Sequence, residues 1–172
     1  MNIKLELSDN CYYIKLTRGL KGNALNSDSI DQLLETIDQV SANANAKCLV
    51  ILADGKNFCT GLDLNWLKKC SLTTKHNIET ETAKLEQVFN KLDNLNIAKI
   101  AIIHGKVIGA GIGLIATCNL VIADNKTEFS LPELSIGILP AVILPYLINV
   151  IGKSKARAYA ITKKPWDAQR AL

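Results

Sequence analysis

Three short apolar runs, at residues 47–53, 100–103 and 120–123, constrain the fold of this chain more than any other feature. In none of them do polar residues alternate with apolar ones, a pattern typical of strands that are covered on both faces. Stretches with apolar residues every three to four positions lie between the runs, as expected for helices that cover such a sheet. The pattern predicts an α/β fold with mostly parallel strand pairing.

The other elements follow from local signals. Residues 3–7 and 11–16 alternate apolar and polar side chains around the turn pair Asp9-Asn10, which predicts a β-hairpin. Ser27 or Asp28 is placed to cap a helix whose apolar positions run from Ile30 to Val40. Further helices are predicted near residues 65–70, 76–94, 114–117, 142–151 and 154–162.

The length and charge fit one small domain, residues 1–172. A net charge of +4, from 20 basic and 16 acidic residues, is mild, and no Lys/Arg run suggests nucleic acid. The longest apolar stretch, around residues 136–151, is broken by Gly and Pro, so no membrane span is expected. The first residues lack an apolar signal segment, and we expect a cytoplasmic protein.

The cysteines and histidines predict neither a metal site nor a disulfide framework. The five cysteines are odd in number and none has C-x-x-C spacing, so most are expected to be small buried hydrophobes in a reducing compartment. The two histidines have no carboxylate cluster nearby. His76 is expected at an exposed helix end and His104 in a structural hydrogen bond.

Two loops rich in small residues, 57–64 and 104–113, follow predicted buried strands. Glycine lets the backbone approach a ligand, and a strand–loop–helix junction leaves N–H groups free to stabilise an oxyanion. An isolated loop of this kind is more often a packed turn. The run Gly109-x-Gly111-x-Gly113 also suggests a dinucleotide site, but it comes late in the chain and Asp124 follows it too soon.

Four blocks in order carry a resemblance to the crotonase (enoyl-CoA hydratase/isomerase) superfamily. They are RGLKGNALN at 18–26, FCTGLDL at 58–64, the glycine-rich block 104–124 and FSLPELSIGILP at 129–140. Asn119 stands where Asp is commoner in the family. The glycine-rich block and PAVILPY at 140–146 look most like bacterial methylglutaconyl-CoA hydratase-like members.

The resemblance implies a fold and a set of site residues. The fold would be a crotonase-like spiral of ββα units, a core domain over 1–172 that is incomplete at the C-terminus, where a helical part is missing. The backbone N–H groups of Leu62 and Ala110 would form an oxyanion hole for a thioester, and Leu62 in place of the usual Ala would narrow the acyl pocket. Residues expected along the substrate path are Ala24, Leu25, Asp63, Leu64, Gly109 and Gly111.

The resemblance also implies partners. The ligand would be an acyl-CoA thioester, with coenzyme A as part of the substrate and no separate cofactor. Lys21 or Lys56 could meet the coenzyme A phosphates, but for either lysine an ordinary solvated surface charge is the better explanation. Family members form trimers, often paired into hexamers, so a homo-oligomer is expected if the fold is complete.

Acid–base chemistry would rest on Glu133. Two-carboxylate hydratases of the family carry a second Glu where this chain has Gly113. Partial burial of Glu133 would raise its pKa into a useful range, while the alternative is a structural carboxylate at a helix start after Pro132. Three functions stay open: an acyl-CoA hydratase, a Δ3–Δ2 enoyl-CoA isomerase, and a truncated, non-catalytic fragment that binds acyl-CoA or assembles with a partner.

Overall fold

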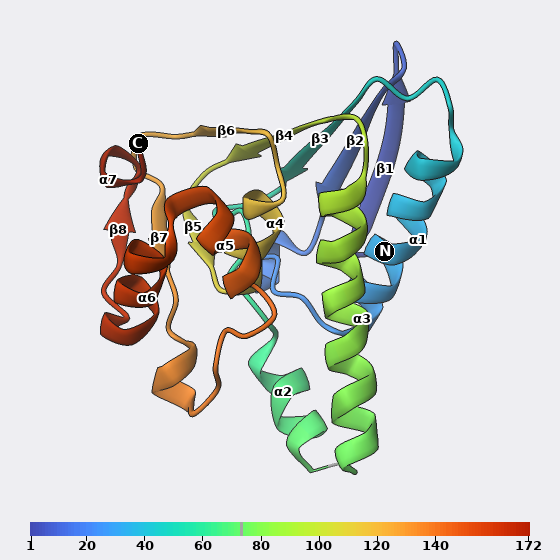
Figure 1. Ribbon diagram of the computed structural model, residues 1–172. Helices are drawn as coiled ribbons and strands as arrows, with labels where there is room; N and C mark the ends of the chain where they lie inside the picture. Colours follow the sequence, from blue (N-terminus) through green and yellow to red (C-terminus); the bar gives the residue numbers. More distant parts are fainter. Residues whose placement is uncertain (73) are drawn as a thin grey trace.

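The computed structural model describes residues 1–72 and 74–172 and contains a five-stranded and a three-stranded sheet (Figure 1). The strands of the larger sheet, in spatial order, are β1 (Ile3–Ser8), β2 (Cys11–Leu16), β3 (Cys48–Ala53), β4 (Ala98–Ile103) and β6 (Leu120–Ala123). Those of the smaller sheet are β5 (Lys106–Ile108), β7 (Glu128–Ser130) and β8 (Trp166–Asp167). The helices are α1 (Ser27–Ala42), α2 (Leu64–Ser71), α3 (Lys75–Asn94), α4 (Ala110–Ala116), α5 (Leu144–Ile151), α6 (Lys153–Thr162) and α7 (Ala168–Ala171), with 3-10 turns η1 (Gly19–Lys21) and η2 (Glu133–Ile136).

Strand pairing confirms the predicted α/β architecture. β1 and β2 form the antiparallel hairpin, and β2, β3, β4 and β6 pair in parallel. At the hairpin turn both Asp9 and Asn10 have positive φ, as a two-residue hairpin turn requires. Because β2, β3 and β4 run in parallel, their carboxyl ends meet at one edge of the sheet, and the loops that leave this edge build the candidate site.

Helices α1 and α3 lie side by side over the sheet (Figure 1). Their apolar faces join one hydrophobic core with the strands, which explains the periodic spacing in the sequence. Asn26, not Ser27 or Asp28, caps α1: its side-chain oxygen accepts a hydrogen bond from the Ser29 N–H at 3.0 Å. Ser27 and Asp28 therefore lie in the first turn, one and two residues after the cap.

The edge strand β6 differs from the expectation of a strand covered on both faces. Leu120 is 52% exposed and Ile122 is 51% exposed. Only β4 pairs with β6 in this sheet among the residues that the structure describes. The apolar run identified a strand correctly, but its position at the edge leaves its side chains in solvent.

The prediction that no disulfide forms is wrong for one pair. Cys11 and Cys48 are bonded, with their Cα atoms 4.8 Å apart. They are separated by 37 positions in sequence, and the parallel register of β2 and β3 makes them direct neighbours. Cys59 is free and fully buried, and burial raises the pKa of its thiol to about 12. The other four cysteines are half-buried, so the expectation that most of them are buried is wrong.

No helix in the described part of the chain is both long and apolar enough to cross a bilayer. The helix α3, at 20 residues, has the length, but polar and charged side chains cover much of its surface.

Gly105 offers a test of how closely the loops pack. Its φ is +60°, and a Cβ there would overlap the carbonyl oxygen of Lys56. We expect Gly105→Ala to lower the free energy of unfolding by about 3 kcal/mol, from left-handed strain plus overpacking. Gly137→Ala is the matched control. Its φ is +73°, but no atom would lie within 4 Å of the added Cβ, so we expect the free energy of unfolding to fall by only about 1 kcal/mol. Equal losses in urea unfolding would contradict this account of the loop contact.

Candidate active site

The two glycine-containing loops pair with each other as parallel strands. The Phe58 N–H donates to the His104 carbonyl at 2.9 Å, and the Ile108 N–H donates to the Cys59 carbonyl at 2.9 Å. These bonds flank a parallel bridge between Cys59 and Val107. Loops that are separated by more than 40 positions in sequence are therefore held in register mainly by backbone hydrogen bonds, together with the bond from the Lys106 N–H to the Asn57 side chain.

Segments on both sides extend this ladder. Leu25 and Leu62 form a second parallel bridge, and β5 pairs with β7. The Gly109 N–H donates to the Ser130 carbonyl at 3.1 Å, which brings Gly109 beside the segment that leads to Glu133. Successive units thus each give one strand to the large sheet and one short segment to this ladder, which confirms the expected spiral of ββα units.

The Leu62 and Ala110 amides come from adjacent segments of this ladder. The Leu25 N–H donates to the Gly61 carbonyl and the Asp63 N–H to the Leu25 carbonyl, both at 2.8 Å, so the Leu62 N–H lies on the other side of its strand. A Cβ on Gly61 would lie 3.9 Å from the Ala110 nitrogen. Among the described residues, no acceptor receives a hydrogen bond from either Leu62 N or Ala110 N.

Glu133 begins η2, and its carboxylate lies against the backbone of Gly109. A Cβ on Gly109 would lie 2.5 Å from Glu133 Oε1 and 3.8 Å from the Gly61 Cα. Oε2 is buried and has no hydrogen-bond partner among the described residues. Burial therefore raises the pKa of Glu133 above the 4.5 of a solvated glutamate. Glu133 does stand at a helix start, but its carboxylate turns toward the loop junction.

Apolar side chains occupy the place that a carboxylate at position 113 would need. A Cβ on Gly113 would lie 2.5 Å from Ile143 Cγ2 and 2.6 Å from Phe89 Cζ. The backbone of α4 is thus packed directly against α3 and the residue before α5. The absence of a second glutamate is accompanied by a closed apolar wall, and Glu133 is the carboxylate that lies against Gly109.

The residues predicted along the substrate path divide into two groups. Leu64 is 60% exposed at the start of α2, whereas Ala24 and Leu25 are buried, so their side chains belong to the core. Gly111 packs on Cys59: a Cβ there would lie 2.8 Å from the Cys59 carbonyl oxygen. Asp63 is held in protein contacts through both carboxylate oxygens.

The remaining polar candidates have simple structural explanations. His104 Nε2 lies 2.9 Å from the Gly55 carbonyl oxygen, which confirms a structural hydrogen bond, and His76 is exposed in the first turn of α3. Lys21 and Lys56 are exposed. No group of three or more His, Cys, Asp or Glu side chains in the described part of the chain is arranged to hold a metal ion.

Two residues of the 18–26 motif have roles that the sequence did not indicate. Asn23 is 2% exposed, and its side-chain amide donates to the Asp54 carbonyl at 2.7 Å and the Asn57 carbonyl at 2.8 Å. It ties its own loop to the one after β3. Arg18 reaches Asp63 and the Ala24 carbonyl. The only signal for either residue was its place in a motif recognised by resemblance.

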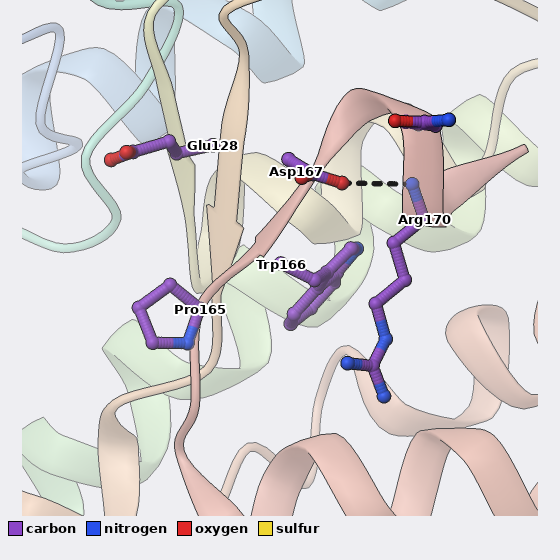
Figure 2. A pocket seen from close by; sticks show the side chains of 6 residues that line it. Glu128, Pro165, Trp166, Asp167 and Arg170 are labelled. Atoms are coloured by element: carbon purple, nitrogen blue, oxygen red, sulfur yellow. Dashed lines mark hydrogen bonds between the residues drawn. The ribbon is translucent and has the colours of Figure 1, made fainter.

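A hollow of about 500 Å³ lies elsewhere, on the side of β7 and β8 (Figure 2). It is lined by Glu128, Pro165, Trp166, Asp167, Gln169 and Arg170. The Asp167 side chain accepts a hydrogen bond from the Arg170 N–H at 2.8 Å and so caps α7. None of the lining residues belongs to the predicted site, so this hollow adds nothing to the assignment.

Comparison with known proteins gives a consistent picture. The family model described as enoyl-CoA hydratase/isomerase matches residues 6–172. The chain is 30% identical over 159 residues to the 2,3-dehydroadipyl-CoA hydratase of Escherichia coli (strain K12), covering 92% of this chain and 60% of that protein. It is 25% identical over 182 residues to a mitochondrial Delta(3,5)-Delta(2,4)-dienoyl-CoA isomerase of Dictyostelium discoideum, covering 98% of this chain and 61% of that one.

A solved structure has the same fold. The crystal structure of an enoyl-CoA hydratase from Shewanella pealeana ATCC 700345 superposes with a TM-score of 0.97 at 30% identity, and the match covers 100% of this chain and 65% of that one. The chain therefore spans less than two thirds of the length of each of these three relatives.

The burial of Glu133 predicts a pH-dependent stability. A raised pKa stabilises the fold below pH 4.5, and this contribution is lost as the pH rises through the folded-state pKa. Glu133→Gln has no such titration. We therefore expect the stability of the parent chain relative to this variant to fall as the pH rises from 4 toward neutrality, measured by urea unfolding across that range. A difference that stays constant with pH would contradict the buried, unpartnered carboxylate.

The apolar wall at Gly113 predicts that a restored glutamate will not fit. We expect Gly113→Ala to lower the free energy of unfolding by about 1–3 kcal/mol through contact with Phe89 and Ile143. Gly113→Glu should cost more and should add no activity. Ile143→Ala removes the contacting Cγ2. We therefore expect the double variant Gly113→Ala/Ile143→Ala to lose less stability than the sum of the losses in the two single variants. If the losses of stability measured by thermal unfolding are purely additive, this contact is not the cause of the destabilisation.

Proposed function

Because the chain belongs to the enoyl-CoA hydratase/isomerase family, we propose that it is an acyl-CoA hydratase of enoyl-CoA or methylglutaconyl-CoA type. One observation carries the proposal: the Glu133 carboxylate lies against Gly109 with its Oε2 buried and without a hydrogen-bond partner, and Gly109 directly precedes one of the two unpaired amides. The chain spans only part of its relatives' length, so the proposal concerns the site that this part builds.

In this proposal the thioester carbonyl oxygen accepts hydrogen bonds from the Leu62 and Ala110 N–H groups. Water adds to an α,β-unsaturated thioester through an enolate, whose negative charge collects on that oxygen. Amides fixed before the reaction stabilise this charge without reorganising, and one such donor is worth about 3–4 kcal/mol of barrier. The backbone ladder, with its bonds at 2.8–3.1 Å around these residues, supports such fixed placement.

Glu133 moves the proton. Its carboxylate takes a proton from water as the water oxygen bonds to the β-carbon, and the resulting carboxylic acid gives that proton to the α-carbon as the enolate collapses. The net change is one water across the double bond, and Glu133 returns to its starting state. A pKa raised by burial makes the carboxylate a stronger base for the first step.

A Δ3–Δ2 enoyl-CoA isomerase is the second candidate. The Gly113 position provides no second carboxylate, and moving one proton from the α-carbon to the γ-carbon needs only Glu133 and the same amides. The similarity to a protein named as a dienoyl-CoA isomerase agrees with this alternative. In both reactions Leu62 carries a larger side chain than Ala beside the thioester, and we propose that it limits the acyl group.

We also propose a cytoplasmic homo-oligomer, a trimer or hexamer. Support comes from family resemblance and from the exposed apolar side chains of β6, among them Leu120 and Ile122, which offer a surface for a partner. Coenzyme A enters only as part of the substrate, with no separate cofactor.

Incubation with crotonyl-CoA and 3-methylglutaconyl-CoA tests hydration through loss of the enone absorbance, and a 3-enoyl-CoA tests isomerisation through its gain. We expect Glu133→Gln to lower the rate by roughly 10²–10⁴-fold. Glu128→Gln is the control, because Glu128 is exposed on β7. If thioesters bind without turnover, the chain is a non-catalytic binding fragment. An unchanged rate in Glu133→Gln would remove the role given to this residue.

A further inference from the structure

Arg18 connects the two segments that form the Leu25–Leu62 bridge. Its Nη2 lies 2.9 Å from Asp63 Oδ2, and its Nη1 donates to the Ala24 carbonyl. The side chains of Arg18 and Asp63 are only 18% and 17% exposed, which sets this pair apart from the more exposed ion pairs of the surface. One guanidinium thus contacts the residue before Leu25 and the residue after Leu62.

Asp63 also connects the Arg18 side chain to the backbone of the loop and to the start of α2. Its Oδ1 accepts hydrogen bonds from the N–H groups of Asn65 at 2.9 Å and Trp66 at 3.2 Å, which caps the helix. Its own N–H donates to the Leu25 carbonyl at 2.8 Å. The hydrogen bond from Arg18 is also the main reason that the pKa of Asp63 is lowered, so its carboxylate stays charged near neutrality.

The peptide of Leu62 is therefore fixed from both sides. On one side Gly61 accepts a hydrogen bond from the Leu25 N–H, and on the other Asp63 is held by Arg18 and by the start of α2. Rotation of the Leu62 N–H would require Asp63 to leave the guanidinium or the helix. An arginine suits this position because its planar group donates in two directions at once, which a lysine ammonium on a flexible chain does not reproduce.

We infer that Arg18 is a positioning residue for the reaction: through Asp63 and the Ala24 carbonyl it sets the direction of the Leu62 N–H. The inference rests on the proposed function, because it concerns the same oxyanion site. Arg18 acts on the stabilisation of the enolate and does not itself touch the reacting atoms. Its loss should therefore lower kcat much more than it raises KM.

The test compares Arg18→Ala, Arg18→Lys and Asp63→Asn, with the same thioester for all. We expect Arg18→Ala to lower kcat by about 10- to 100-fold with little change in KM, because misplacing a catalytic group by about 1 Å can cost this much. Arg18→Lys keeps the charge and should recover only part of kcat. Asp63→Asn keeps a side-chain oxygen that can cap α2. A lower kcat in this variant, with an unchanged melting temperature, would show that the position of the loop and not the stability of the fold has changed.

The control is Lys84→Ala, which removes an ion pair of the same length, 2.9 Å to Asp31, between α3 and α1. Added guanidinium should raise kcat of Arg18→Ala and leave that of Lys84→Ala unchanged. If Arg18→Ala does not fold, Arg18→Lys and Asp63→Asn decide the matter. A wild-type kcat in the folded variants, alongside inactive Glu133→Gln, would overturn the role of Arg18 and leave the proposed function intact. An unchanged rate in Glu133→Gln would instead remove the proposed role of Glu133, and a parent chain that turns over none of the thioesters would remove the proposed function.

Discussion

The candidate site depends on direct backbone pairing between loops that follow different strands. Parallel strands bring their carboxyl ends to one edge of the sheet, but this alone does not set the register of the loops that leave it. Here the hydrogen bonds from Phe58 to His104 and from Ile108 to Cys59 set that register. Gly105 permits the contact, because any side chain there would overlap the Lys56 carbonyl. Backbone hydrogen bonds and one glycine thus fix the two amides relative to each other.

The carboxylate is held in a different way. Glu133 lies at the start of a single 3-10 turn, which ends at Gly137 with positive φ, and its side chain packs on the bare backbone of Gly109. Burying its Oε2 without a hydrogen-bond partner costs free energy, and burial raises the pKa of Glu133. The backbone hydrogen bonds around Gly61, Gly109 and Leu25 hold the loops in place despite this cost. A weakly solvated carboxylate against the loop that precedes Ala110 is the arrangement on which the proposed proton transfer rests.

The lack of a side chain at Gly113 is a packing feature of α4. Phe89 from α3 and Ile143 at the start of α5 fill the volume around Gly113, so the helix can lie close to both. The same closeness recurs at Gly111, which packs on Cys59. Small residues in α4 therefore have two effects. They leave the N–H groups at the helix start uncovered by side chains, and they let the helix pack closely against the core.

The sequence by itself determined what depends on local chemistry. The alternation around Asp9-Asn10 specified the hairpin, the apolar runs specified strands, and the apolar spacing from Ile30 to Val40 specified α1. Resemblance then indicated which loops would meet and named Leu62, Ala110 and Glu133 as candidates. Only the tertiary structure decided the exposure of β6, the Cys11–Cys48 bond and the connection of Arg18 to Asp63. Each of these depends on the register and order of segments far apart in the chain, and such contacts have no local sequence signal because many partners of the same chemistry compete for them.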